Sequence, residues 1–140
     1  MSAIVATPAA TTSSVPTVGS LLRVGAGATV LAAVATAAVA AAGPVVGISV
    51  DISGAPIPVS GFATLTVIFS VIGLLIAVGL RRFARRPRAM WIRTTVALTV
   101  LSLVPDVLVD AAATTKVLLM VTHLVAAAIV IPAVARRLRA

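Results

Sequence analysis

Four long apolar segments constrain what this chain can fold into more than any other feature. A helix needs about 20 apolar residues to cross roughly 30 Å of hydrocarbon, and each segment is close to that length. Helix is the expected conformation, because lipid offers no partner for backbone N–H and C=O groups. We therefore predict an all-α fold, a four-transmembrane-helix membrane bundle. Its helices are expected at about residues 20–42, 62–80, 94–111 and 116–135, within a domain of residues 20–140 that follows a flexible tail at residues 1–19.

The composition excludes the main alternative, a soluble domain. Of the 140 residues, 61% are hydrophobic and only 10% are charged. Soluble domains carry about 25% charged residues, and a chain this short has too little interior to hide so much apolar surface. The chain has no cysteine, which excludes a disulfide framework, a thiolate zinc site and a thiol nucleophile.

The basic residues gather in the connections on one side of the predicted bundle. The loop between the second and third segments holds six arginines, three more follow the fourth segment, and Arg23 begins the first. Only Lys116 falls on the other side. The positive-inside rule therefore predicts a multi-pass protein of the cytoplasmic (inner) membrane with both termini in the cytoplasm. The loop arginines are Arg81, Arg82, Arg85, Arg86, Arg88 and Arg93, and Trp91 among them fits an anchor at the membrane interface.

The same arginine loop predicts a partner. Basic side chains near a membrane surface attract anionic lipid head groups, at about 1 kcal/mol each. We therefore expect the lipid bilayer as the main partner, with anionic lipids at the cytoplasmic face. Nucleic acid is not expected, despite a net charge of +8, because the basic loop is short and held at the membrane. A homo-oligomer or another membrane protein stays open as a partner.

The first apolar segment has a second interpretation, because its small residues resemble a cleavage site for a secretory signal. Residues 38–40 read Ala-Val-Ala, which fits the A-x-A pattern. However, the apolar run is longer than the usual signal core, and almost no positive charge precedes it. We expect a retained helix.

The connection at residues 43–61 carries a pattern of its own. Apolar and polar residues alternate over residues 48–52, and this period of two is the strand signal. Gly54 and Pro56 then interrupt the run. The pattern predicts a small β-hairpin in the first outer loop, in which residues 48–52 pair with residues 57–60 around Gly54 and Ala55. An irregular loop is the alternative.

Two of the three carboxylates lie inside the third apolar segment, directly after Pro105 or close to it. Asp106 and Asp110 are four residues apart and so share one face of a helix, which Ser102 and Thr99 continue. A carboxylate at the centre of a bilayer costs about 2.5–3.5 kcal/mol. This face is therefore expected to meet other helices or water.

The short connection before the fourth segment predicts which residues meet. Positions equally far from it lie at similar depth, so that Asp106 matches His123 to within about 3 Å. Asp110 matches Lys116 or its neighbours, nearer the outer surface. We predict an intramembrane polar cluster of Asp106, Asp110, His123, Ser102, Thr99 and Lys116.

Two interpretations of this cluster stay open. In the first, the polar side chains hold helices together, at about 0.6 kcal/mol per contact on average. In the second, they mark a proton or ion pathway, as ionisable groups within a membrane often do. Three carboxylates and one histidine are few for a transporter, which favours the first interpretation. A metal site made of Asp106, Asp110 and His123 is not expected.

Sequence signatures of enzymes are absent. The chain has no P-loop pattern and no G-x-S-x-G turn, and a chain without glutamate cannot carry H-E-x-x-H. We expect no cofactor. The prediction is a non-enzymatic accessory or scaffold protein, and the alternative is a proton- or cation-responsive membrane protein that uses Asp106 and His123.

Several short motifs resemble an uncharacterised family of small bacterial four-helix integral membrane proteins. They are SLVPD at residues 102–106, HLVAAAIVIP at 123–132, GFATLTVIFSVIG at 61–73 and RPR at 86–88. The resemblance spans residues 20–137. It implies four membrane helices and a domain of unknown function, and it gives Asp106 and His123 no assigned role.

Overall fold

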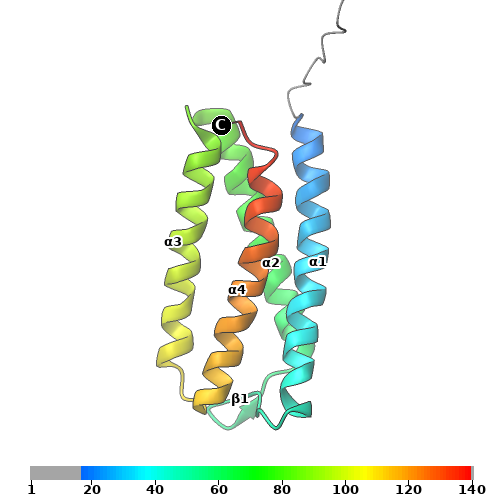
Figure 1. Cartoon of the computed structure of the whole chain (residues 1–140), viewed down its shortest axis with the longest axis vertical. Coiled ribbons are helices and arrows are strands. Elements are labelled where there is room, and N and C mark those ends of the chain that lie inside the picture. The colour runs from blue at the N-terminus through cyan, green and yellow to red at the C-terminus, as the bar shows by residue number, and fades with distance from the viewer. Residues whose placement is uncertain (1–16, 140) are drawn as a thin grey trace, which may run out of the picture.

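The computed structural model describes residues 17–139, and it shows four helices that run side by side (Figure 1). All four helices are long and apolar enough to cross a membrane. The predicted all-α bundle with a small β-hairpin is therefore confirmed. The elements are α1 (Val18–Val45), β1 (Asp51–Ile52), β2 (Ala55–Pro56), α2 (Val59–Phe83), α3 (Pro87–Leu108) and α4 (Ala113–Ala135).

The start of α1 is set by a side-chain cap. The hydroxyl of Thr17 accepts a hydrogen bond from the backbone N–H of Ser20 at 3.2 Å. Such a cap satisfies one of the N–H groups that the first turn of a helix leaves without a partner. Most of the tail predicted at residues 1–19 lies outside the described residues, and its last two residues, Val18 and Gly19, are the first of α1.

The third helix departs most from its predicted bounds, residues 94–111. It begins at Pro87, because proline suits the first helical position, where no N–H donor is needed. Its last hydrogen bond runs from the N–H of Val109 to the carbonyl of Pro105 at 2.8 Å. Val109 and Ala112 are then extended, with ψ of 145° and 150°. Asp110 therefore lies beyond the helix, and the prediction that it shares a helical face with Asp106 is wrong.

Small residues let α1 pack closely against its neighbours. A side chain at Gly25 would collide with Leu74 of α2. Further along the same pair of helices, the hydroxyls of Thr36 and Thr66 lie 2.9 Å apart and share a hydrogen bond. Small residues at helix contacts are typical of membrane bundles, where close backbone approach supplies the packing energy.

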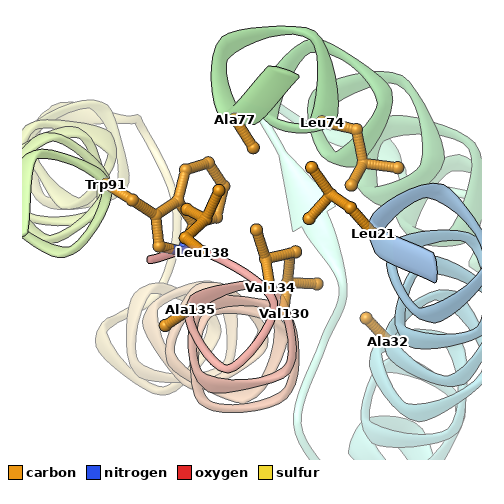
Figure 2. Packing of buried hydrophobic residues seen from close by; sticks show 9 residues of the cluster. All are labelled: Leu21, Ala32, Leu74, Ala77, Trp91, Val130, Val134, Ala135 and Leu138. Atoms are coloured by element: carbon orange, nitrogen blue, oxygen red, sulfur yellow. The ribbon is translucent and has the colours of Figure 1, made fainter. Parts of the chain in front are cut away.

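Most of the buried apolar side chains form two clusters, one toward each end of the bundle. Figure 2 shows the larger cluster, in which side chains from all four helices and from the C-terminal residues point toward a common centre. The smaller one joins Ala40, Phe62 and Leu119 near the hairpin. Members of the larger cluster are Leu21, Ala32, Leu74, Ala77, Trp91, Val130, Val134, Ala135 and Leu138.

Trp91 is part of this larger cluster and does not anchor the chain at a lipid interface, as its position in the sequence had suggested. Its side chain is 1% exposed, and its indole Nε1–H donates to the carbonyl of Ile131 in α4 at 3.0 Å. The early start of α3 explains the difference, because it places Trp91 on a helix that packs against α4. A buried indole N–H usually finds such an acceptor.

The hairpin is shorter than predicted, and its turn lies one residue earlier. Asp51 pairs with Pro56 and Ile52 with Ala55, so that the turn consists of Ser53 and Gly54. Both turn residues have positive φ, 50° and 78°. A two-residue hairpin turn of this kind needs positive φ at both central positions, which glycine adopts without strain and alanine does not.

Candidate functional site

The candidate site is the contact between Asp106 of α3 and His123 of α4. Nδ1 of His123 lies 2.8 Å from Oδ2 of Asp106. Asp106 is buried, whereas the side chain of His123 is 40% exposed. The structure thus brings together the two residues that were expected to lie at the same depth, and it leaves one side of the histidine open to its surroundings.

The extended connection explains why these two residues are level. Asp106 is close to the end of α3, whereas His123 lies about three turns into α4. His123 is therefore further from the connection than Asp106 is. An extended residue advances about 3.3 Å, against about 1.5 Å in a helix, so the extended residues between the two helices make up for this difference in distance.

Nδ1 of His123 has two oxygen atoms close by. Nδ1 lies 3.1 Å from the carbonyl of Leu119 in its own helix, besides its contact with Asp106. The contact with Oδ2 is close but poorly aligned for a hydrogen bond, and this buried oxygen has no other partner in the described part of the chain. If Asp106 is ionised, Nδ1–H faces both acceptors; if Asp106 is protonated, its hydroxyl can donate to a bare Nδ1. The contact is therefore compatible with more than one state of protonation.

The hydroxyls of the predicted polar face do not join this contact. Thr99 donates to the carbonyl of Thr95 at 2.8 Å, and Ser102 donates to the carbonyl of Thr99 at 2.7 Å. Both hydrogen bonds stay within α3, which is a common choice for Ser and Thr inside a helix. Of the members of the cluster that the sequence predicted, Asp106 and His123 are therefore the two whose side chains contact each other between helices.

Lys116 and Asp110 do not meet, although the sequence placed them at one depth. Nζ of Lys116 donates to the carbonyl of Val107 at 2.9 Å. The last carbonyls of a helix have no intrahelical partner, and a basic side chain near that end satisfies them and interacts favourably with the helix dipole. Asp110 is exposed, and its backbone carbonyl accepts a hydrogen bond from the N–H of Ser53 at 2.9 Å, which ties the hairpin to the α3–α4 connection.

The arginines gather at the opposite end of the bundle, which we call the arginine end. Figure 1 shows that the start of α1, the α2–α3 connection and the C-terminal residues all lie there. Arg81 and Arg82 are in the last turn of α2. Arg85 and Arg86 lie in the connection between α2 and α3, and Arg88 and Arg93 are in α3. No salt bridge to any of these arginines is found among residues 17–139.

The C-terminal residues fold over this loop, a contact that the sequence did not predict. The N–H of Arg88 donates to the carbonyl of Arg139 at 3.1 Å, and Nη1 of Arg81 donates to the carbonyl of Arg137 at 3.5 Å. Leu138 between them is buried in the larger apolar cluster. An apolar residue between arginines was the one signal for this packing.

A family model described as a family of unknown function (DUF6069) matches residues 16–140. The chain belongs to this family. The match covers every helix and the hairpin, and it confirms the resemblance to an uncharacterised family. Membership of DUF6069 supplies no activity, so the geometry of the chain itself has to indicate its function. No curated protein and no solved structure matches the chain.

Proposed function

We propose that this protein is a non-enzymatic, multi-pass accessory or scaffold protein in which the contact between Asp106 and His123 holds α3 to the rest of the bundle. This contact is the observation that carries the proposal. Within residues 17–139 it is the one contact between polar side chains that joins α3 to another helix. The two remaining polar links between α3 and α4, from Trp91 and from Lys116, end on backbone carbonyls.

The distribution of charge supports a location in the cytoplasmic membrane with both termini in the cytoplasm. Ten of the 11 basic residues are arginines, and all ten belong to the arginine end. Lys116, Asp51 and Asp110 belong to the opposite end, where the β-hairpin lies and which we call the hairpin end. The positive-inside rule assigns the arginine end to the cytoplasm. Anionic lipids of the cytoplasmic leaflet are then the expected partners of the arginines.

Exposed apolar side chains support a role in which the bundle meets lipid or other membrane proteins over most of its surface. They follow the outer faces of α2 and α3, and they include Leu65, Phe69, Leu75, Val100 and Leu101. Apolar side chains are favourable in hydrocarbon, so a bilayer or a membrane-embedded partner is a suitable neighbour for these faces.

The comparison of Asp106→Asn with Asp106→Leu tests the proposal. Asparagine keeps a polar group beside His123, whereas leucine leaves Nδ1 with the carbonyl of Leu119 in its own helix and no polar side chain of α3. In mild detergent, Asp106→Leu should lower the free energy of unfolding by about 0.6–2 kcal/mol, and Asp106→Asn should lose less. Asp110→Leu is the matched control, because Asp110 is exposed, and it should behave like the wild type. Wild-type stability of Asp106→Leu would contradict the proposal.

A second candidate function is a proton- or cation-responsive protein that uses the same pair. Two features favour it: His123 is partly exposed, and the buried Oδ2 of Asp106 lacks an aligned hydrogen bond. Buried polar atoms without partners are rare and often belong to sites that bind or move something. Proteoliposomes with a pH-sensitive dye inside test this candidate. Proton flux that stops in Asp106→Asn while the fold survives would support it, and equal flux with and without protein would exclude it for protons.

A further inference from the structure

Two shallow hollows lie in line along one face of α3. The first, of about 500 Å³, is lined by Arg86, Arg88, Ala89 and Ile92 at the arginine end. The second, of about 430 Å³, lies further along the helix and is shared with α4. Ala89 and Ile92 of the first hollow and Val96 and Thr99 of the second follow one another at spacings of three and four residues, so all four share one helical face.

The second hollow is apolar on both of its sides. Val96 and Val100 line it from α3. From α4 it is lined by Leu124, Ala128 and Pro132, which follow one another at a spacing of four residues. Thr99 contributes the polar atom, and its hydroxyl is already bonded to its own helix. A flexible hydrocarbon chain fits the chemistry of this surface.

Two arginines line the first hollow, at the end of a helix where positive charge is unfavourable. Arg86 occupies the N-cap of α3, Arg88 lies in its first turn, and the first turn holds no acidic residue. The N-terminus of a helix has a partial positive charge, so two guanidinium groups are unfavourable there and an anion beside them is stabilised. The backbone N–H of Arg88 already donates to the carbonyl of Arg139, so the guanidinium groups are the donors left for an anion. Among residues 17–139, neither arginine has a carboxylate partner.

Because two arginines lie next to an apolar groove, we infer that this face of α3 binds one anionic phospholipid. The phosphate lies at Arg86 and Arg88, and an acyl chain follows Ala89 and Ile92 into the groove between α3 and α4. The inference rests on the proposed placement of the arginine end at a membrane surface and assigns its lipid partner to a defined site. Guanidinium groups suit a phosphate, because their N–H donors match its oxygens in pairs.

A second copy of the chain fits this surface less well than a lipid does. The side-chain carboxylates of the chain are Asp51, Asp106 and Asp110, and none of them belongs to the arginine end. A neighbouring copy in the same orientation would therefore bring more arginines and no carboxylate side chain to Arg86 and Arg88. An anionic phospholipid supplies both the charge and the hydrocarbon.

Native mass spectrometry of the full chain tests the inference, with phosphatidylglycerol and phosphatidylcholine offered in equal amounts. The wild type should retain one phosphatidylglycerol in preference to phosphatidylcholine. Arg86→Gln combined with Arg88→Gln should weaken this retention roughly thirtyfold, since each charge near the surface is worth about a factor of five. Arg23→Gln combined with Arg82→Gln is the matched control, because it removes the same charge from α1 and α2, at residues that line neither hollow.

A second pair of variants tests the groove without changing charge. Ala128→Phe fills the hollow shared by α3 and α4 from an exposed position, whereas Ala26→Phe adds the same bulk at an exposed position of α1. Phosphatidylglycerol should be lost from the first variant and kept by the second.

Three results would overturn the inferred site. Equal loss in both arginine pairs would mean that lipid is held by diffuse charge, which refutes the site and leaves the general attraction to anionic lipids intact. No preference for phosphatidylglycerol in the wild type would refute both. A dimer that Ala128→Phe converts to monomer, with lipid retention unchanged, would assign the groove to a second copy.

Discussion

Nζ of Lys116 donates to the backbone carbonyl of Val107 at 2.9 Å, although the sequence had predicted that it would lie level with Asp110. The lysine therefore stabilises the end of α3 and does not pair with a carboxylate. This contact and that of Asp106 with His123 both join α4 to the last turns of α3. The helices α3 and α4 are thus joined at the hairpin end by these two contacts. At the arginine end they are joined by the hydrogen bond from the indole of Trp91 to the carbonyl of Ile131.

Replacing Lys116 with methionine should destabilise the bundle by about 0.5–1.5 kcal/mol, because a helix carbonyl loses its donor. Arginine at this position should retain most of the stability, since a guanidinium can donate to the same carbonyl. Chemical unfolding in mild detergent measures the difference. Asp110→Asn is the control and should be neutral. If Asp110→Asn costs as much as Lys116→Met, the two side chains interact and the assignment of the lysine to Val107 fails.

Two glycines of α1 should respond differently to the same substitution. Gly25 faces Leu74, and its Cβ would have no room, whereas a Cβ at Gly27 would meet no atom within 4 Å. Gly25→Val should therefore cost about 1–3 kcal/mol through overpacking, and Gly27→Val should be close to neutral. Thermal unfolding of the two variants side by side checks this. Equal behaviour would mean that α1 and α2 are further apart than described.

The orientation can be tested with single cysteines, because the chain has none of its own. Cysteine at Ala84, in the α2–α3 connection, should be shielded from an impermeant thiol reagent in intact cells. Cysteine at Ser53, in the exposed hairpin turn, should react. Permeabilised cells provide the control, in which both positions should react. Labelling of Ala84→Cys from outside would reverse the proposed orientation.

The first helix is predicted to remain in the mature protein. It contributes Leu21 to the larger apolar cluster and Ala40 to the smaller one, so that its removal would open both. The intact mass of the purified chain checks this directly. A mass that corresponds to cleavage after Ala40 would show that the segment acts as a signal.

The number of helices, the hairpin and the meeting of Asp106 with His123 could all be predicted from the sequence. Each follows from a strong local rule: the length of apolar runs, the alternation over residues 48–52, and the equal depth of residues on either side of a short connection. Hydropathy, by contrast, marks the apolar part of a helix and not its ends. For that reason α3 was expected to start at residue 94, and the arginines of its first turns were read as a loop.

The remaining errors follow from these helix ends. With α3 beginning at Pro87, Trp91 packs against α4 inside the bundle. With α3 ending at Leu108, Asp110 leaves the helical face of Asp106, and a free carbonyl becomes the partner of Lys116. The packing of the C-terminal residues on the arginine loop depends on the tertiary contacts of Leu138. In the sequence, one apolar residue among arginines is too weak a pattern to predict these contacts.

The double-mutant cycle of Asp106→Leu and His123→Leu tests the central claim most directly. The free energy of unfolding is measured in one detergent for the wild type, the two single variants and the double variant. If the pair holds α3 to α4, the double variant should lose less stability than the sum of the single losses, with a coupling of about 0.6–2 kcal/mol. Losses that add within about 0.3 kcal/mol would show that the two residues act independently, and would contradict the account.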